Sequence, residues 1–217
     1  LLNCIAGVYP VEAGAIIIDG VDVTKFREPK RAAILGRVFQ EPMLATASTM
    51  GIEENLALAL RRGQRRGLKW GISNKEREKY RELLTTLELG LENRLSTKVG
   101  LLSGGQRQAL TLLMATLKEP KLLLLDEHTA ALDPKTAQKV LEMSDLIVRE
   151  HDLTTLMVTH NMRDAIQYGN RLIMMHEGRI ILDIRGEEKK NLAVEDLLRR
   201  FGNASGEEFV DSDALLA

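Results

Sequence analysis

The chain has 217 residues, 44% hydrophobic and 28% charged, which is the balance of a soluble globular protein with one large domain or two small lobes. Its formal net charge of −1 gives no global electrostatic reason to bind nucleic acid, and its single cysteine, Cys4, excludes an intrachain disulfide and favours a reducing compartment. No apolar stretch approaches the roughly 20 residues that cross a bilayer, and Leu1–Gly7 has no basic flank typical of a signal peptide.

The N-terminal part of the chain predicts short elements separated by glycine and proline. We expect an apolar helix over 1–6 that ends at Gly7, a strand over 15–18 with a turn at 19–20, a polar linker over 22–29, a helical turn over 31–35 and a strand over 36–39. Leu1 is not a methionine, and the chain begins inside an apolar helical pattern. We therefore expect the natural N-terminus to lie upstream.

From residue 46 the pattern becomes helical. We expect helices over 52–60 and 74–89, the second capped by Asn74 and followed by Gly90. The stretch 61–69 between them carries five basic residues. It is interpreted first as a solvated loop, second as a contact with lipid headgroups or a membrane partner, and third as a nucleic-acid contact with Trp70 nearby to stack on a base.

The second half of the chain alternates helices and strands. In order, we expect a helix from Ser103 to 119, a buried strand over 122–125, a helix from 134 to 150 capped by Asp133, a strand over 153–159, a helix to 167 capped by Asn161, a hairpin of 171–176 with 179–184, a helix over 192–201 and a polar tail. The strand–helix–strand order across 122–160 predicts a right-handed parallel α/β unit.

Two adjacent carboxylates, Asp126 and Glu127, end the leucine-rich strand. Ligands bind at the carboxyl ends of strands in open α/β sheets, where one acid can hold a metal ion while the other activates water. The alternative is that the acids only bring the strand end to solvent.

Three other polar segments can likewise be interpreted either as ligand-binding or as purely structural. The Ser-Gly-Gly-Gln segment 103–106 starts a helix, where free N–H groups and the helix dipole favour an anion, but it is also an ordinary serine cap. Gln40 follows a short strand and could orient water or complete a metal shell. His160 follows another strand and could contact a phosphate oxygen or be structural.

Four segments together carry a resemblance. LLSGGQRQAL (101–110), LLLLDEHTAALD (122–133), VFQEP (38–42) and VTHNM (158–162) resemble the signature, the Walker B motif with the D-loop, the Q-loop and the H-loop of ABC-type ATPases. They occur in that family's order, and the resemblance extends over about residues 1–184.

The resemblance implies ATP and Mg²⁺ as cofactors and assigns roles to the acids and their neighbours. Asp126 is expected to hold Mg²⁺, usually through water, and Glu127 to act as general base. His160 is expected to contact the γ-phosphate, and Gln40 to sense the metal and the water. Catalysis in such a site is mainly positioning and charge stabilisation.

The resemblance also implies a homodimer. Ser103, Gly104, Gly105 and Gln106 are expected to bind ATP that is held by a second protomer. Asp133 is expected to lie on the loop that communicates across the dimer interface.

The chain departs from the family's pattern in two places. The phosphate loop G-x-x-x-x-G-K-[ST] is absent, since no Gly-Lys pair occurs. We expect that this sequence begins just after the loop and that, as written, it binds ATP poorly and is inactive. A naturally loop-less pseudo-ATPase is the alternative. His128 stands where the family usually has Pro or Ala, and is interpreted as a lineage variation.

The implied fold class is α/β, a P-loop NTPase-like core with a parallel sheet, an inserted helical subdomain and a C-terminal β-hairpin and helix. We expect a RecA-like ATPase core over 1–45 and 101–201, incomplete at its N-terminus, a helical subdomain over 46–100 and a flexible tail over 202–217.

The expected function is the ATPase subunit of a membrane importer of a small organic solute such as an amino acid, peripheral at the cytoplasmic face. Its partners would be separate integral membrane permease subunits, gripped by the Gln40 loop and residues 43–70, and an extracytoplasmic solute-binding protein. The alternatives are a soluble ABC ATPase of translation or DNA repair and a non-catalytic interaction protein.

Overall fold

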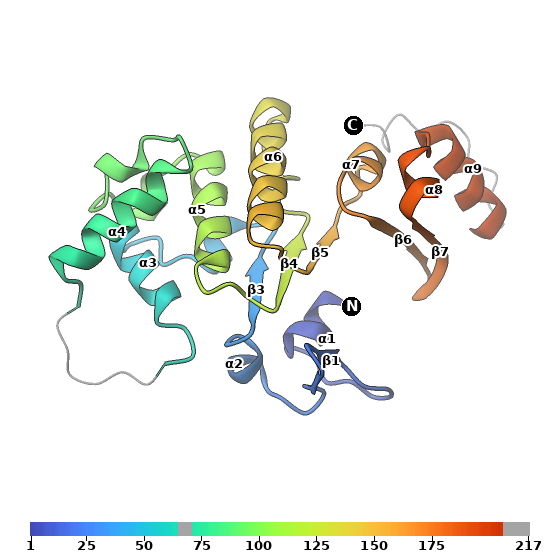
Figure 1. Ribbon diagram of the computed structural model, residues 1–217, viewed down its shortest axis with the longest axis horizontal. Helices are drawn as coiled ribbons and strands as arrows, with labels where there is room; N and C mark the ends of the chain where they lie inside the picture. Colours follow the sequence, from blue (N-terminus) through green and yellow to red (C-terminus); the bar gives the residue numbers. More distant parts are fainter. Residues whose placement is uncertain (65–70, 206–217) are drawn as a thin grey trace. The chain divides into compact units, whose positions relative to one another are not determined.

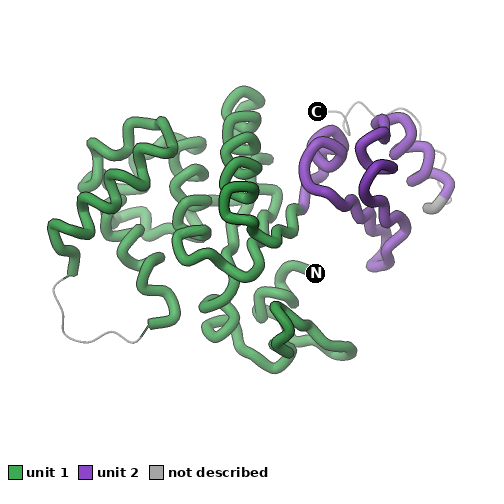
Figure 2. The backbone as a smooth tube through the Cα atoms, viewed as in Figure 1, with its two compact units in different colours: residues 1–157 green, residues 158–217 purple. Residues whose placement is uncertain are grey.

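The computed structural model describes residues 1–64 and 71–205 (Figure 1). The chain forms two compact units that divide between Met157 and Val158 (Figure 2). The first unit is built around a three-stranded sheet in the order β3-β4-β5, in which β3 is Leu35–Val38, β4 is Leu122–Asp126 and β5 is Thr155–Val158. The α/β class and the parallel sheet predicted from the sequence are confirmed, since β3 and β4 run parallel.

The central strand β4 is the leucine strand of the sequence. Leu123 and Leu124 are completely buried and Leu125 is 2% exposed, so both faces of the strand are covered. In the parallel ladder Leu35 lies opposite Leu122 and Val38 opposite Leu125. A continuous apolar run is typical of such a doubly covered strand, because neither face meets water.

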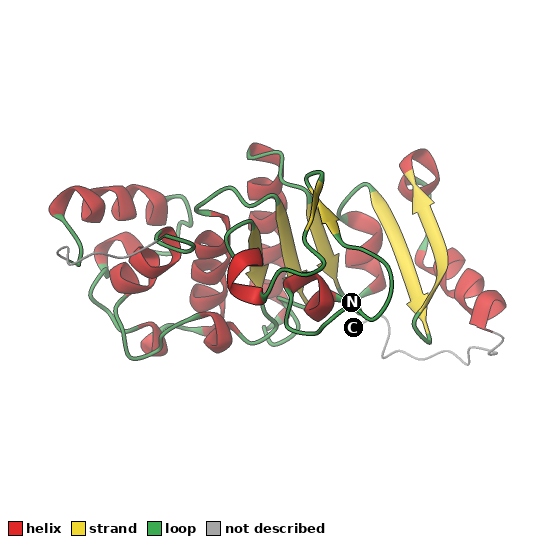
Figure 3. Ribbon diagram, turned by 90° about the horizontal axis from the view of Figure 1, so that it is seen from below, coloured by secondary structure: helices red, strands yellow, loops and turns green. Residues whose placement is uncertain are grey.

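Helices cover one face of the sheet (Figure 3). Val38, Leu123 and Leu125 pack there with residues of α5 (Gly104–Thr116) and α6 (Pro134–Glu150). A Cβ atom at Gly36 would lie 2.7 Å from the carbonyl oxygen of Ala115, so glycine lets α5 approach the strand closely.

The opposite side of β3 contacts the N-terminal segments. These are α1 (Leu2–Ala6), α2 (Glu28–Arg31) and the antiparallel hairpin of β1 (Ile17–Ile18) with β2 (Val21–Asp22). Leu35 packs there with Ile18 and Val23. The expected end of the first helix is confirmed by Gly7, whose φ of 84° is the left-handed conformation that glycine adopts without cost.

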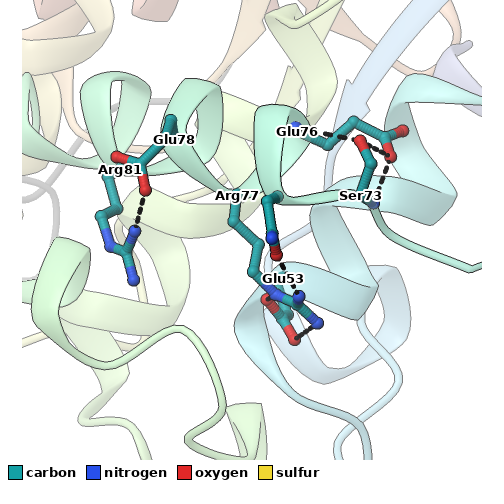
Figure 4. A network of polar contacts seen from close by, with 7 residues as sticks. Glu53, Ser73, Glu76, Arg77, Glu78 and Arg81 are labelled. Atoms are coloured by element: carbon teal, nitrogen blue, oxygen red, sulfur yellow. Dashed lines mark hydrogen bonds and ion pairs between the residues drawn. The ribbon is translucent and has the colours of Figure 1, made fainter.

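A second cluster in the first unit joins helices between residues 42 and 116. Its elements are η1 (Pro42–Ala45), α3 (Ile52–Leu60), α4 (Asn74–Thr85), η2 (Leu91–Asn93), η3 (Val99–Leu101) and the adjoining α5. Ile52, Leu56, Tyr80, Leu84 and Leu110 form its buried centre. Figure 4 shows Arg77 of α4 reaching Glu53 of α3, with Nε 2.7 Å from Oε2.

Helix α4 differs from its prediction at both ends. The cap is Ser73 rather than Asn74, because Ser73 Oγ accepts from the Glu76 amide and Glu76 Oε2 accepts from the Ser73 amide at 2.7 Å (Figure 4). The helix ends at Thr85 rather than at residue 89, and the backbone turns at Glu88, which has a φ of 53°. The helical turn predicted over 31–35 is also displaced, since α2 ends at Arg31 and Leu35 begins β3.

The second unit begins with α7 (Met162–Gln167), followed by the antiparallel hairpin of β6 (Arg171–His176) and β7 (Arg179–Arg185), then α8 (Gly186–Lys190) and α9 (Val194–Ser205). Met162, Leu172, Ile184 and Leu197 lie in its core. The sequence missed α8, and α9 continues through Ser205 into the stretch expected to be a tail. Residues 206–217 and the basic residues between 65 and 69 lie outside the described ranges.

Within residues 1–64 and 71–205, every helix falls short of the length and apolarity required to cross a membrane. The longest, α6, has 17 residues and a charged outer face.

A buried arginine holds the N-terminal segments together. Arg31 is 1% exposed and donates only to backbone carbonyls, with Nη1 2.6 Å from Cys4 O and 2.8 Å from Ile5 O. Its Nη2 lies 2.8 Å from Thr24 O and its Nε 2.8 Å from Phe26 O. Arg31 therefore supplies a donor to Ile5 O at the end of α1 and a second donor to Cys4 O, which also accepts from the Gly7 amide.

Replacing Arg31 with Met should lower the free energy of unfolding by about 3 kcal/mol, because buried carbonyls lose charged hydrogen-bond donors. Urea unfolding followed by circular dichroism measures the change. The matched control is Arg27→Met, since Arg27 is exposed and four residues away, and it should change stability by less than about 0.5 kcal/mol. Equal stability of the two variants would contradict the role given to Arg31.

Candidate functional site

The acidic pair lies at the carboxyl end of β4. Asp126 is the last residue of the strand, and Glu127 follows it with a φ of 43°, in the left-handed region that disfavours side chains with a Cβ. Val38 ends β3 opposite Leu125, so Gln40, two residues further on and exposed, emerges at the same edge of the sheet. The structure therefore brings Gln40, Asp126 and Glu127 to one edge.

A basic side chain that the sequence analysis missed lies on Asp126. Arg37 Nη2 is 2.9 Å from Asp126 Oδ2 and 2.8 Å from Asn3 Oδ1. The guanidinium carbon of Arg37 lies 4.4 Å from the centre of the Phe39 ring. A charged residue inside a strand of otherwise apolar residues was the available signal, but its partner depends on the register of β3 against β4.

The Ser-Gly-Gly-Gln segment begins α5 as predicted. Ser103 is the N-cap, with Oγ 3.3 Å from the Gln106 amide nitrogen, and Gln106 Oε1 accepts from the Ser103 amide at 3.2 Å. Ser103 and Gly104 are exposed. The serine and glutamine side chains thus cap the helix, while the exposed start of α5 presents backbone N–H groups.

The starts of α5 and α6 pack against each other. Asp133 is exposed and caps α6, with Oδ1 3.1 Å from the Thr136 amide nitrogen. Hydrogen bonds from the Thr136 side chain and backbone lower the pKa of Asp133. A Cβ atom at Gly105 would overlap Thr136 Cγ2, and one at Gly104 would lie 3.2 Å from Leu132 Cδ2. Gly105 therefore has a packing role in addition to the phosphate approach inferred from the sequence.

His160 belongs to the second unit, two residues after the end of β5, and its side chain is exposed. It lies near Asp164 of α7. Burial raises the pKa of Asp164, and the charge of His160 acts in the opposite direction.

His128, directly after the acidic pair, is buried with 2% exposure. Its Nε2 lies 3.0 Å from Ser144 Oγ, and Ser144 Oγ donates to Val140 O at 2.7 Å. Because Ser144 Oγ donates its proton to Val140 O, it accepts from the Nε2–H of His128. Burial lowers the pKa of His128 to about 4. His128 therefore ties the loop after β4 to α6.

The donors at this edge suit Mg²⁺ with a nucleotide better than a metal held by protein alone. No group of three or more His, Cys, Asp or Glu side chains that could hold a metal occurs among the residues described. Mg²⁺ usually keeps several waters and takes one or two carboxylates together with substrate phosphates. Asp126, with a side chain 32% exposed at the strand end, fits that pattern.

Replacing Gly105 with Ala should lower the free energy of unfolding by about 1–3 kcal/mol, because the new methyl group overlaps Thr136 Cγ2. Gly104→Ala is the control. Its methyl group meets only the end of the Leu132 side chain, and alanine favours a helix by up to about 1 kcal/mol. Thermal unfolding of both variants measures the difference, and a destabilised Gly104→Ala beside a stable Gly105→Ala would refute the packing role.

The buried His128 should make stability depend on pH. Its pKa is about 4 when folded and 6.5 when unfolded, so between these values the unfolded chain binds the extra proton. As pH falls from 6.5 to 4, the free energy of unfolding should fall by about 3 kcal/mol more in the wild type than in a His128→Gln variant. Urea unfolding across this pH range tests it, and parallel pH curves for the two proteins would contradict a neutral buried ring.

Comparison with known proteins places these features in a family. The family model described as "ABC transporter" matches residues 1–130. The chain is 50% identical over 201 residues to a tyrosine transport ATP-binding protein of Clostridioides difficile (strain R20291). The aligned residues make up 93% of this chain and 80% of the relative. It is 32% identical over 188 residues to the thiamine import ATP-binding protein ThiQ of Shigella flexneri serotype 5b (strain 8401). That alignment covers 87% of this chain and 76% of the relative.

Solved structures agree with the sequence comparisons. An ATP-binding cassette of an ABC transporter in its ADP conformation superposes with a TM-score of 0.72 at 26% identity, covering 92% of this chain and 81% of that chain. A dimeric ATP-binding cassette in a post-hydrolysis state with ADP and Pi gives a TM-score of 0.69 at 28% identity, covering 85% of this chain and 78% of that chain. The motifs, the fold and these likenesses agree, and the chain belongs to the ABC transporter family as an ATP-binding ATPase subunit that uses Mg²⁺.

Proposed function

We propose that this chain is the ATPase of an amino-acid importer, and that the amino acid is aromatic. The observation that carries the proposal is the 50% identity, over 93% of the chain, to a tyrosine transport ATP-binding protein. The chain works with integral membrane permease subunits, as the transporter family requires. A separate extracytoplasmic solute-binding protein delivers the substrate, and the ATPase sits peripherally at the cytoplasmic face.

The edge of the sheet around β4 carries the chemistry. When bound, Mg²⁺ neutralises charge on the ATP phosphates. Asp126 holds the metal, usually through a water molecule, and Glu127 accepts the proton of the attacking water. Gln40 orients that water and the metal shell from the end of β3, and His160 donates a hydrogen bond to the γ-phosphate. The adjacent positions of Asp126 and Glu127 at one strand end support this division.

The helix start at residues 103–106 serves a second copy of the chain. Ser103, Gly104, Gly105 and Gln106 contact the γ-phosphate of ATP held by the partner protomer, through the Ser103 hydroxyl and the N–H groups of α5. Asp133 lies on the loop that carries the signal across the dimer. The exposure of Ser103, Gly104 and Asp133 supports a surface that closes only on dimerisation.

The permease binds beside the Gln40 loop. A cleft of about 380 Å³ lies between α3 and the sheet and is lined by residues that include Phe39, Ala45, Leu58 and Arg62. Leu44 in η1, next to the lining residue Ala45, is 69% exposed. Residues 46–100 form the helical subdomain that moves with the permease, and residues 1–45 and 101–201 form the RecA-like core.

The test is a transporter reconstituted in proteoliposomes with the intact ATPase, the permease encoded beside it and the matching solute-binding protein. Tyrosine inside the solute-binding protein should stimulate ATP hydrolysis several-fold. Glu127→Gln should abolish turnover while ATP still dimerises the subunit, and Glu150→Gln, an exposed residue at the end of α6, should leave turnover unchanged. Full hydrolysis by Glu127→Gln would contradict the general-base role. Stimulation of ATP hydrolysis by another class of solute, but not by amino acids, would refute the proposal that the transported solute is an amino acid.

A further inference from the structure

Arg37 forms an ion pair with Asp126, the carboxylate that binds the metal in the proposed function. Its Nη2 lies 2.9 Å from Asp126 Oδ2. The register explains the contact, because Arg37 lies opposite Leu124, and Asp126 follows two residues later on the same face of β4. With 15% exposure, the Arg37 side chain is less exposed than that of Asp126, so water screens the pair only partly.

The guanidinium is held in this place by more than Asp126. The same Nη2 lies 2.8 Å from Asn3 Oδ1 of α1, and the guanidinium carbon lies 4.4 Å from the centre of the Phe39 ring. Arg37 thus connects Asp126 with α1 and with the residue before Gln40.

Arg37 is nevertheless imperfectly satisfied. Its Nε is buried without a hydrogen-bond partner in the described part of the chain. A buried arginine that serves only as a structural clamp would be expected to use this donor, as Arg31 does with the carbonyl of Phe26. The arrangement suits a group whose partner changes during the reaction cycle.

We propose that Arg37 is a positioning residue that competes with the divalent cation for Asp126 and so sets the metal affinity of the ATPase. The inference rests on the proposed role of Asp126. A cation and a guanidinium on one carboxylate repel each other, so Arg37 weakens metal binding until the metal displaces it. For a divalent cation about 5 Å from the guanidinium in an aqueous dielectric, this repulsion corresponds to roughly a 15-fold loss of affinity, which screening at physiological salt reduces to about fivefold.

The experiment titrates Mn²⁺ alone into the intact, nucleotide-free ATPase subunit and counts free Mn²⁺ by electron paramagnetic resonance. Arg37→Met should bind Mn²⁺ about three- to tenfold more tightly than the wild type. Arg37→Lys keeps the charge and should stay within about twofold of the wild type. The control Lys121→Met removes an exposed charge from the opposite end of β4, where Lys121 pairs with Asp19 at 3.0 Å, and should change nothing.

Two further variants separate the possible failures. Asp126→Asn should weaken Mn²⁺ binding; if it does not, the metal role of Asp126 is wrong, and the competition proposed for Arg37 is overturned with it. If Asp126→Asn weakens binding while Arg37→Met binds as the wild type does or more weakly, competition by Arg37 is overturned. Should Arg37→Met fail to fold by thermal unfolding, Arg37→Gln also removes the charge, and tighter binding is expected of it for the same reason.

Discussion

Burial of the leucines in β4 is the constraint on which the rest of the structure depends. Three consecutive leucines lose nearly all contact with water, and each contributes about 2 kcal/mol. This is possible only if the strand is central and covered on both faces, by α5 and α6 on one side and the N-terminal segments on the other. The strand must then end at the surface, and it does so at Asp126 and Glu127.

The polar side chains of the candidate site are held by partners from the same chain. Arg37 pairs with Asp126, Ser103 and Gln106 bind each other's backbone, and Asp133 caps α6. Under the proposed function, an entering phosphate or cation would therefore exchange with existing contacts rather than fill an empty space. For an ATPase that drives a transporter, such exchange couples ligand binding to movement of the elements that carry those contacts.

Local signals predicted most of the fold. Asp133 with Pro134 placed α6, and Glu177 with Gly178 placed the β6–β7 hairpin, because caps and turns depend on neighbouring residues. Ser73 and Asn74 are both good caps, so the start of α4 was ambiguous. The pairings Arg37–Asp126 and His128–Ser144 join residues 89 and 16 positions apart, and no local pattern reveals them. Strand ends and a helix start indicated the candidate site residues, the resemblance supplied their individual roles, and those roles stay predictions.

The left-handed backbone of Glu127 has an evolutionary consequence. A residue with a Cβ at such a φ costs roughly 1 kcal/mol, whereas glycine or asparagine adopts it more easily. Selection for folding stability alone would therefore favour replacement of the glutamate at position 127. With the proposed general-base role of Glu127, loss of hydrolysis through this one position should be over-represented among variants that survive heat or long storage, and a screen for stability must also measure activity.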